Sequence, residues 1–250
     1  MSTNINAEFD SVLFHTNAST FLELYDIIPN LFFYVKDVRQ HFLWMNTMLR
    51  ELLGETEPTG FYNKTDADYF TPDLVFLYQR EDNEVIASGR AIINQPWFVP
   101  ACNEKQRWFI SSKFPLRDRG GDIVAIAGIM RNLDHEYKSV NPLGEMKAVL
   151  DYIFTHYSER ITLEDLAQLV FLSPRQFERY FQKLFKVSPS NFILKFRTDI
   201  AMKRLIESED SITQIAIACG FYDNSYLTRQ LKKMTGMTPI KFRTEYGKKE

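Results

Sequence analysis

Hydrophobic residues follow two different periods along the 250-residue chain. Before residue 136 they form short runs rich in aromatic and β-branched residues, which is typical of β-strands. These runs are LFFYVKD (31–37), HFLWMN (41–46), RWFISSKF (107–114) and DIVAIAGIM (122–130). After residue 144 they recur every three to four positions, which indicates amphipathic helices. The pattern predicts an α+β first half with an antiparallel sheet and short helices, followed by an all-α domain.

Turns and breaks divide the chain further. DVRQ (37–40) and RDRGGD (117–122) have the composition of hairpin turns, and residues 47–95 between the hairpins predict short helices and loops. A polar stretch broken by proline and glycine predicts a linker at 136–144. The expected domains are therefore a helical N-terminal extension (1–25), a sheet domain (26–135) and a helical domain (145–246).

The order of elements in the first half resembles a PAS sensor domain. The resemblance is carried by PNLFFYVKD, by WMN opening a helix that ends at Gly54, by KTDADYF (64–70) and by KFPLRDRGGDIVAIAGIMRNL from residue 113. It covers roughly residues 26–134 and rests on the order of these motifs. It implies a sensor or dimerisation domain.

Strand alternation assigns side chains to the two faces of the expected sheet. If Lys36 faces water, Phe33 and Met45 point inward, and we expect Trp108 and Ser112 to line the same inner face. These four residues are the candidates for a small-molecule pocket, with a filled core as the alternative.

The outer face would then carry four large side chains: Phe32, Tyr34, Phe42 and Trp44. An exposed patch of that size usually marks an interface. We expect its cover to be the helix near residues 20–28 or a second copy of the chain, which makes a homodimer our expectation for this domain.

The helical half contains an internal repeat. LEDLAQLVFLSPRQFERYFQKLFKVSPSNF (163–192) aligns with ITQIAIACGFYDNSYLTRQLKKMTGMTPIKF (212–242), so that Arg179 meets Arg229. Each unit predicts a helix-turn-helix, whose second helix places polar residues in the major groove. The connecting segment 190–206 predicts a helix of about 25 Å. Two units so connected can reach successive major grooves, which lie about 34 Å apart.

The longer helix of each unit has an apolar stripe and a polar face. The candidate DNA-binding residues lie on the polar faces: Arg175, Glu178, Arg179 and Gln182 in the first unit, and Asn224, Ser225, Thr228, Arg229 and Lys232 in the second. Further candidates for phosphate contacts are Lys183, Lys233, Lys241 and Arg243. Because the polar face recurs in both units, DNA reading is favoured over an ordinary solvated surface.

Residues 145–243 resemble the DNA-binding domain of the AraC/XylS family of bacterial transcription regulators. The resemblance is carried by ITLEDLAQLVFLSPRQFERYFQKLF, FRTDIAMKRLI and IAIACGFYDNSYLTRQLKKMTGMTPIKFR. It implies base contacts from Arg175, Glu178 and Arg179 in the first unit. In the second unit it implies base contacts from Asn224, Ser225, Thr228 and Arg229.

The chain departs from the family at two positions, since the family usually has phenylalanine where Leu227 and Leu231 stand. The departures keep the buried stripe apolar. Glu178 is another departure: it cannot bond a phosphate, but it can accept a hydrogen bond from a cytosine amino group or orient Arg175 and Arg179.

Charge separates the same two halves. Residues 1–142 hold 13 Lys+Arg and 19 Asp+Glu, whereas residues 143–250 hold 17 and 13, so the net charges are −6 and +4. A basic half favours a polyanionic partner, and we expect promoter DNA. RNA polymerase and a small-molecule effector are further candidate partners. Two alternatives stay open: a PAS-mediated dimeric interaction module without ligand sensing, and a protein-binding helical platform.

Other chemistries lack support in the sequence. No Ser/His/Asp elbow, paired metal ligands or phosphate-cradling glycine loop occurs, so we expect no enzyme, no metal site and no cofactor. His41 in a hairpin turn argues against haem, and Cys102 in a loop argues against a photoreactive flavin. Two unpaired cysteines favour a reducing cytoplasm. The longest apolar run, IVAIAGIM (123–130), is far shorter than the roughly 20 residues of a membrane helix.

Overall fold

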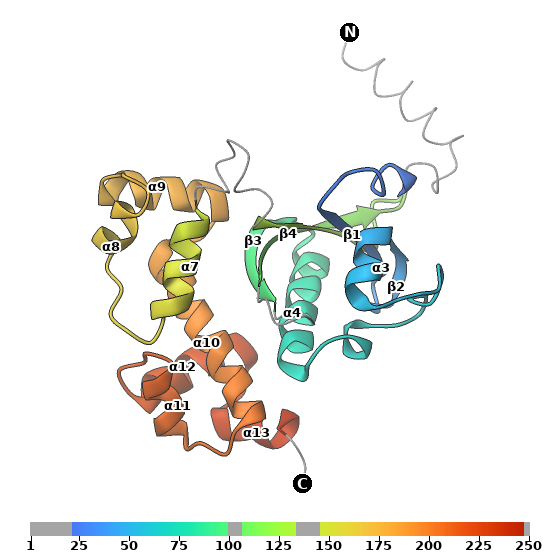
Figure 1. The fold of residues 1–250 in the computed structure, drawn as a ribbon. Coiled ribbons are helices and arrows are strands. Elements are labelled where there is room, and N and C mark those ends of the chain that lie inside the picture. The colour runs from blue at the N-terminus through green and yellow to red at the C-terminus, as the bar shows by residue number, and fades with distance from the viewer. Residues whose placement is uncertain (1–21, 100–106, 134–145, 248–250) are drawn as a thin grey trace.

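The computed structural model describes residues 22–99, 107–133 and 146–247. Figure 1 shows a twisted sheet with helices on one side and a separate group of helices beside it. Most of the expected N-terminal extension and the whole linker at 136–144 lie outside the described residues.

The sheet has five strands in the order β2-β1-β5-β4-β3, with every neighbouring pair antiparallel. The strands are β1 (Leu31–Asp37), β2 (Phe42–Met45), β3 (Ile92–Val99), β4 (Arg107–Arg117) and β5 (Ile123–Asn132). Both predicted hairpins are present, with Gln40 and Gly121 supplying the positive φ angles of their turns. Strand β3 was not predicted, because Pro96 interrupts it. Proline is tolerated there because β3 is an edge strand.

Two helices and a 3₁₀ turn follow β2: α3 (Thr47–Leu53), η1 (Asp66–Asp68) and α4 (Pro72–Ser88). Asn46 connects the first of them to the sheet, because its Oδ1 accepts from the amides of Phe33 and Leu49. Helix α4 has 17 residues and is longer than the short helices expected between the hairpins. These elements cover the sheet face that we call the inner face (Figure 1).

The expected assignment of side chains to the two sheet faces is wrong for β1 and β4, whereas Met45 of β2 joins the inner-face cluster as expected. Lys36 is only 1% exposed, and its Nζ lies 2.6 Å from Asp66 Oδ2 and 3.0 Å from Asp82 Oδ2. Two buried carboxylates thus compensate for the desolvation of the ammonium and let Lys36 face inward. Phe32 and Tyr34 share this inner face, where they join a buried cluster with Leu49.

The expected aromatic patch on the outer face is therefore absent. Phe33 lies there instead and stacks on Tyr25, with ring centroids 4.0 Å apart. Trp44 is only partly buried, and its ring centroid lies 5.6 Å from that of Phe33. The segment before β1 supplies the cover for this end of the outer face.

All regular elements in residues 146–247 are helices, as expected. They are α7 (Lys147–His156), α8 (Leu163–Gln168), α9 (Pro174–Phe185), α10 (Pro189–Glu207), α11 (Ile212–Ala218), α12 (Asn224–Thr235) and α13 (Pro239–Tyr246). Helix α10 joins two units, α8–α9 and α11–α12. Its 19 residues span about 28 Å.

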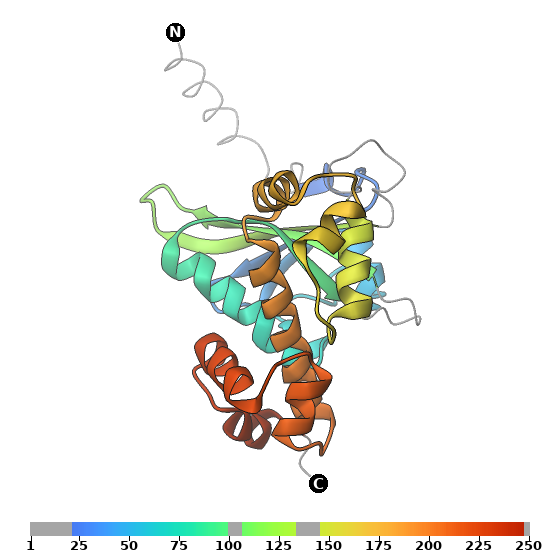
Figure 2. The same cartoon turned by 90° about the vertical axis from the view of Figure 1, so that its left-hand side faces the viewer.

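Each unit shares its hydrophobic core with the sheet domain. The first core includes Trp108 and Ile110 from β4, and the second includes Leu77 from α4 and Trp97 from β3. Figure 2 shows α10, in orange, passing alongside α4, in blue-green. The helical half is thus packed against the sheet domain rather than only tethered to it. No helix in the described part of the chain is long and apolar enough to cross a membrane.

Candidate nucleic-acid interface

Helix α9 presents the predicted polar face of the first unit. It begins at the N-cap Ser173, which forms a capping box with Gln176, and Pro174 occupies its first turn. Phe177, Phe181 and Phe185 are buried on one side. The four candidate residues on the other side are all exposed: Arg175, Glu178, Arg179 and Gln182. This face is accessible to a partner.

Helix α12 presents a different face in the second unit. Leu227 and Leu231 are fully buried, and the N-cap Asp223 accepts from the amide of Tyr226 at 2.6 Å. Of the candidate residues, Thr228 is partly buried, and the exposed ones are Asn224, Ser225, Arg229 and Lys232.

Two side chains of the α12 face are already oriented by neighbours. Asn224 Nδ2 donates to Thr213 Oγ1 at 3.1 Å. The Arg229 guanidinium lies 5.6 Å from the ring centroid of Tyr226, a cation–π distance. Both contacts hold polar groups in the first half of α12, and the N-terminal part of a recognition helix is the part that meets base edges.

The turn of the second unit depends on glycine. Gly220 has φ +75°, and a Cβ there would lie 2.6 Å from the carbonyl oxygen of Tyr157. A glycine in this turn favours a close approach of the two helices of its own unit. The tight contact is instead with the backbone that follows α7. The aligned position in the first unit is Phe171, which has φ +54° and is 97% exposed.

Two arginines hold the loops that precede the units. Arg197 donates from Nε to Tyr157 O and from Nη2 to Glu159 O, both at 2.6 Å. Arg243 donates to Leu205 O at 3.3 Å and to Asp210 O at 2.5 Å. Arg243 was a candidate for phosphate contact, but its guanidinium is engaged in this structural role.

A cavity of about 470 Å³ lies between the inner face of the sheet and the elements α3, η1 and α4. Its walls are mainly apolar and include Leu49, Leu53, Leu74, Phe109 and Met130. Its polar lining includes Lys36, Asp66 and Lys113, together with Tyr34, Ser111 and Tyr78. The inner face is therefore hollow rather than filled.

None of the four predicted pocket residues lines this cavity. Phe33 packs on the outer face, Trp108 lies in the core of the first helical unit, and Ser112 Oγ accepts from the Asn94 amide at 3.0 Å. Met45 is buried beside the cavity, in the cluster around Leu49. The side chains that point inward from β1 and β4 are one position away from those predicted, because Lys36 and Lys113 face inward rather than toward water.

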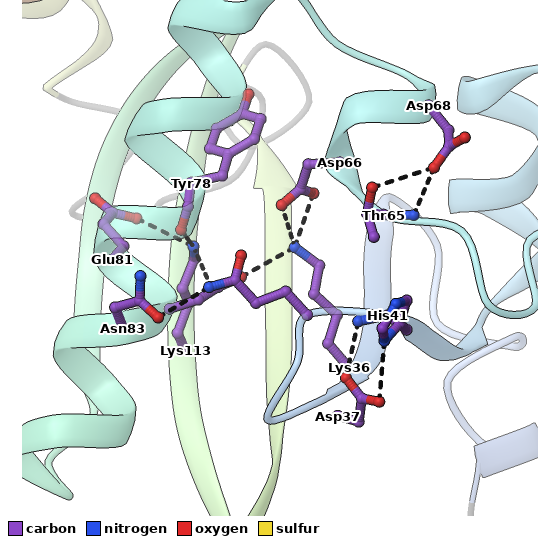
Figure 3. Close-up of polar contacts among 12 residues, drawn as sticks. Lys36, Asp37, His41, Thr65, Asp66, Asp68, Tyr78, Glu81, Asn83 and Lys113 are labelled. Carbon is purple, nitrogen blue, oxygen red and sulfur yellow. Dashed lines mark hydrogen bonds and ion pairs between the residues drawn. The ribbon is translucent and has the colours of Figure 1, made fainter.

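A buried charge network borders the cavity through Lys36, Asp66 and Lys113 (Figure 3). Lys113 Nζ lies 2.6 Å from Asp82 Oδ1 and donates to Tyr78 O at 3.1 Å. The second oxygen of Asp82 contacts Lys36. Burial alone would raise the pKa of Asp82, but the charges of Lys113 and Lys36 outweigh it and hold that pKa below its usual value.

The sequence prediction missed Lys36 and Lys113 of this network, although the strand pattern around Lys113 indicates that it is buried. Lys113 is in phase with Phe109 and Ser111 in RWFISSKF, and all three are buried. A lysine in phase with the apolar positions of a strand indicates either an edge strand or a buried ion pair, and the contacts of Lys113 with Asp82 and Glu81 show the ion pair.

Two families match the chain. A helix-turn-helix domain matches residues 166–245, and a PAS fold matches residues 26–137. The chain therefore combines a PAS fold with an AraC-type helix-turn-helix domain. The PAS fold contains the cavity and its charge network. The AraC-type domain contains both exposed helix faces.

Relatives match this chain over part of its length. YobQ of Bacillus subtilis (strain 168), an uncharacterized HTH-type transcriptional regulator, is 35% identical over 104 residues, which are 41% of this chain and 43% of YobQ. AdaA of the same organism, a bifunctional transcriptional activator and DNA repair enzyme, is 35% identical over 38% of this chain and 45% of AdaA. The chain thus matches less than half the length of these relatives.

A solved structure of a Vibrio cholerae VqmA dimer in the absence of target DNA is also similar. It is 17% identical, with a TM-score of 0.44, and the match covers 74% of this chain and 88% of that one.

Proposed function

We propose that the protein is a sequence-specific DNA-binding transcription regulator whose promoter binding is controlled by its PAS fold. The observation that carries the proposal is the repeated exposed polar face on α9 and α12, at the two ends of α10. The relatives named as transcription regulators support it. AdaA is also a repair enzyme, and we propose only the regulator role for this chain, without enzymatic activity.

The two faces are suited to base reading in successive major grooves. Arg179 and Arg229 can each pair in bidentate fashion with guanine, and Asn224 can pair with adenine. Lys232 at the edge of the second face is placed for phosphate, which adds affinity and salt dependence. The length of α10, about 28 Å, suits units placed about one DNA turn apart.

The cavity supports control by a small effector, and we call it the effector cavity. The two buried lysines are already neutralised by the buried carboxylates of Asp66, Asp82 and Glu81. An anionic effector would therefore meet no excess positive charge there.

The hydroxyls of the effector cavity indicate the chemistry of the effector. Those of Tyr34, Ser111 and Tyr78 form no hydrogen bond with the described residues. Burial raises the pKa of Tyr34 and of Tyr78, so both stay neutral phenols. The fitting effector is an uncharged molecule with an apolar body and hydrogen-bonding groups. Homodimerisation and contact with RNA polymerase belong to the proposal as partners of a promoter-bound regulator.

Selection of genomic DNA by the full-length protein tests the function. We expect an asymmetric motif across two adjacent major grooves, bound with an affinity that falls steeply as salt rises. Enrichment of no sequence by the folded protein, together with salt-independent binding to a protein from host extract, would support a protein-binding platform instead.

Variants of the two arginines test the base reading. Arg179→Ala and Arg229→Ala should each cost roughly 1–3 kcal/mol of binding to the selected site and relax specificity at one end. Arg90→Ala removes the same charge from an exposed position of the PAS fold and should leave specificity unchanged. Equal losses on selected and random DNA would assign both arginines to phosphate instead.

A further inference from the structure

Trp97 on the edge strand β3 forms part of the wall between two cavities. One is the effector cavity, and the other is a cleft of about 680 Å³ between the PAS fold and the helices α7 and α10, which we call the interdomain cleft. Trp97 lines both, as do Thr71 and Leu74 at the start of α4, and it is only 5% exposed. A molecule in the effector cavity can therefore contact a side chain that also faces the helical half.

Residues of the PAS fold orient the indole of Trp97. Trp97 Nε1 donates to Glu81 Oε2 at 3.2 Å, and the ring meets Tyr78 edge to face, with centroids 5.2 Å apart. Glu81 lies 3.5 Å from Lys113 Nζ, which also binds Asp82. The orientation of the indole thus depends on the charge network that borders the effector cavity through Lys36, Asp66 and Lys113.

The helical half contacts the ring of the same indole. Lys195 Nζ lies 4.2 Å from the ring centroid of Trp97, and it also lies 3.4 Å from Asp199 Oδ2. Both residues belong to α10, the helix that joins the two reading units. Because Lys195 is largely removed from water, its cation–π contact is stronger than one at an exposed site.

Among the described residues, the other aromatic contacts between the domains do not reach the effector cavity. Phe76 of α4 packs against Phe242 at 5.6 Å, and Trp108 of β4 packs against Phe196 at 5.7 Å. Neither Phe76 nor Trp108 lines the effector cavity. These contacts hold the domains together, whereas the Trp97 side chain lines both the effector cavity and the interdomain cleft.

We propose that Trp97 couples the effector cavity to the DNA-reading units through its contact with Lys195. The proposal rests on the function proposed above and adds a path for its regulation. An effector that displaces the indole, or that competes with it for Glu81, breaks the cation–π contact between Trp97 and Lys195. The loss of this contact changes the position of α10. The shift is limited to the difference in effector affinity between the two arrangements, and DNA binding must act back on Trp97 to the same extent.

This reciprocity allows a test without knowledge of the effector. The full-length protein is labelled with 5-fluorotryptophan, and its fluorine resonances are assigned with Trp→Phe variants. The selected DNA fragment is then added while binding is followed by anisotropy in the same sample. We expect DNA to shift the Trp97 resonance and to leave that of Trp44, on the distant strand β2, unchanged.

Charge-matched variants of α10 separate coupling from a loss of charge. Lys195→Met should abolish the response of Trp97 to DNA and change the Kd for the selected site roughly 3- to 10-fold. Lys195→Arg keeps a cation over the ring and should keep the response. Lys203→Met removes the same charge from another residue that lines the interdomain cleft, and should keep it too.

The outcomes distinguish the coupling from the function. DNA binding with no change at Trp97, or an intact response in Lys195→Met, would overturn the coupling and leave the proposed function standing. Failure of the anisotropy assay to show specific binding would instead count against the function itself.

Discussion

The two helix-turn-helix units share a sequence repeat but are held in different ways. The first unit packs on the outer sheet face through Trp108 and Ile110. The second packs on Leu77 of α4 and on Trp97, so it meets the elements that line the effector cavity. The repeat therefore specifies two similar reading elements, whereas their contacts with the PAS fold make the second the more direct recipient of a change in the cavity.

The units also differ in the face that they offer to DNA. The α9 face combines Arg175 and Arg179 with the carboxylate of Glu178, whereas the α12 face has the neutral Asn224 and Ser225 beside Arg229. Different donor and acceptor patterns select different bases. Two unlike faces in one chain predict an asymmetric DNA site rather than a palindromic one.

The largest difference in stability between the two units should come from their turns, at Gly220 and Phe171. Gly220→Ala places a Cβ 2.6 Å from Tyr157 O at a positive φ, and the three nearest atoms to this Cβ all belong to the backbone of Tyr157 and Ser158. We expect the variant to lose roughly 2–4 kcal/mol of unfolding free energy. Phe171→Ala, at the matching exposed turn, is the control and should lose little. Urea denaturation measures both, and a loss below about 0.5 kcal/mol in Gly220→Ala would contradict the tight contact.

The second core also contains a thiol that reports on its packing. Burial raises the pKa of Cys219 to about 11, and this residue is fully buried. Because the thiolate is the reactive form, alkylation at pH 8 should be on the order of 100-fold slower than for a free thiol. Since the raised pKa favours the neutral thiol, stability should fall as pH rises from about 9 toward 11.

Measurement of Cys219 needs a Cys102→Ser background, so that mass spectrometry follows one thiol. Alkylation at the rate of the urea-unfolded chain would show that the second core is open.

A smaller effect is expected from the loop arginines, and it should be similar in the two units. Arg197→Met and Arg243→Met each remove two hydrogen bonds to backbone carbonyls. We expect each to cost about 1–3 kcal/mol of unfolding free energy, because a charged donor is lost and at least one partly buried carbonyl is left without it in each case. Thermal denaturation tests this, with the exposed Arg160→Met as control. A loss of stability in only one of the two variants would show that the arginine contacts do not stabilise the two loops equally.

The smallest effect should come from relief of strain in the first turn. Phe171→Gly removes a bulky residue at φ +54°, which lies in a region that favours glycine. The stability gained from this relief is offset by the greater conformational freedom of glycine in the unfolded chain. We therefore expect the unfolding free energy to change by less than about 1 kcal/mol. A loss above 2 kcal/mol would mean that the exposed ring of Phe171 has a packing role.

Local signals explain what the sequence could predict. The buried stripe of α12 follows helical spacing, and Leu227 and Leu231 are indeed fully buried. The hairpin turns depend on neighbouring residues and were also predicted. Strand β3 was missed because Pro96 is unfavourable in most strands, and only its place at the sheet edge makes it acceptable.

Non-local contacts explain what the sequence could not predict. Lys36 faces inward because of Asp66 and Asp82, which lie 30 and 46 residues away in the chain. That one reversal put Phe33, the pocket candidate on β1, on the outer face instead of the inner one. The contact of Lys195 with Trp97 likewise joins two domains, and no period within either segment encodes it.

Hydroxyl-radical footprinting of the selected DNA fragment with the full-length protein tests the central claim most directly, namely that both units of one chain read adjacent major grooves. We predict two protected regions on one face of the duplex, about 10 base pairs apart. Arg179→Ala should weaken protection at one region and Arg229→Ala at the other. A single protected region that responds to only one of the two variants would contradict the two-unit reader.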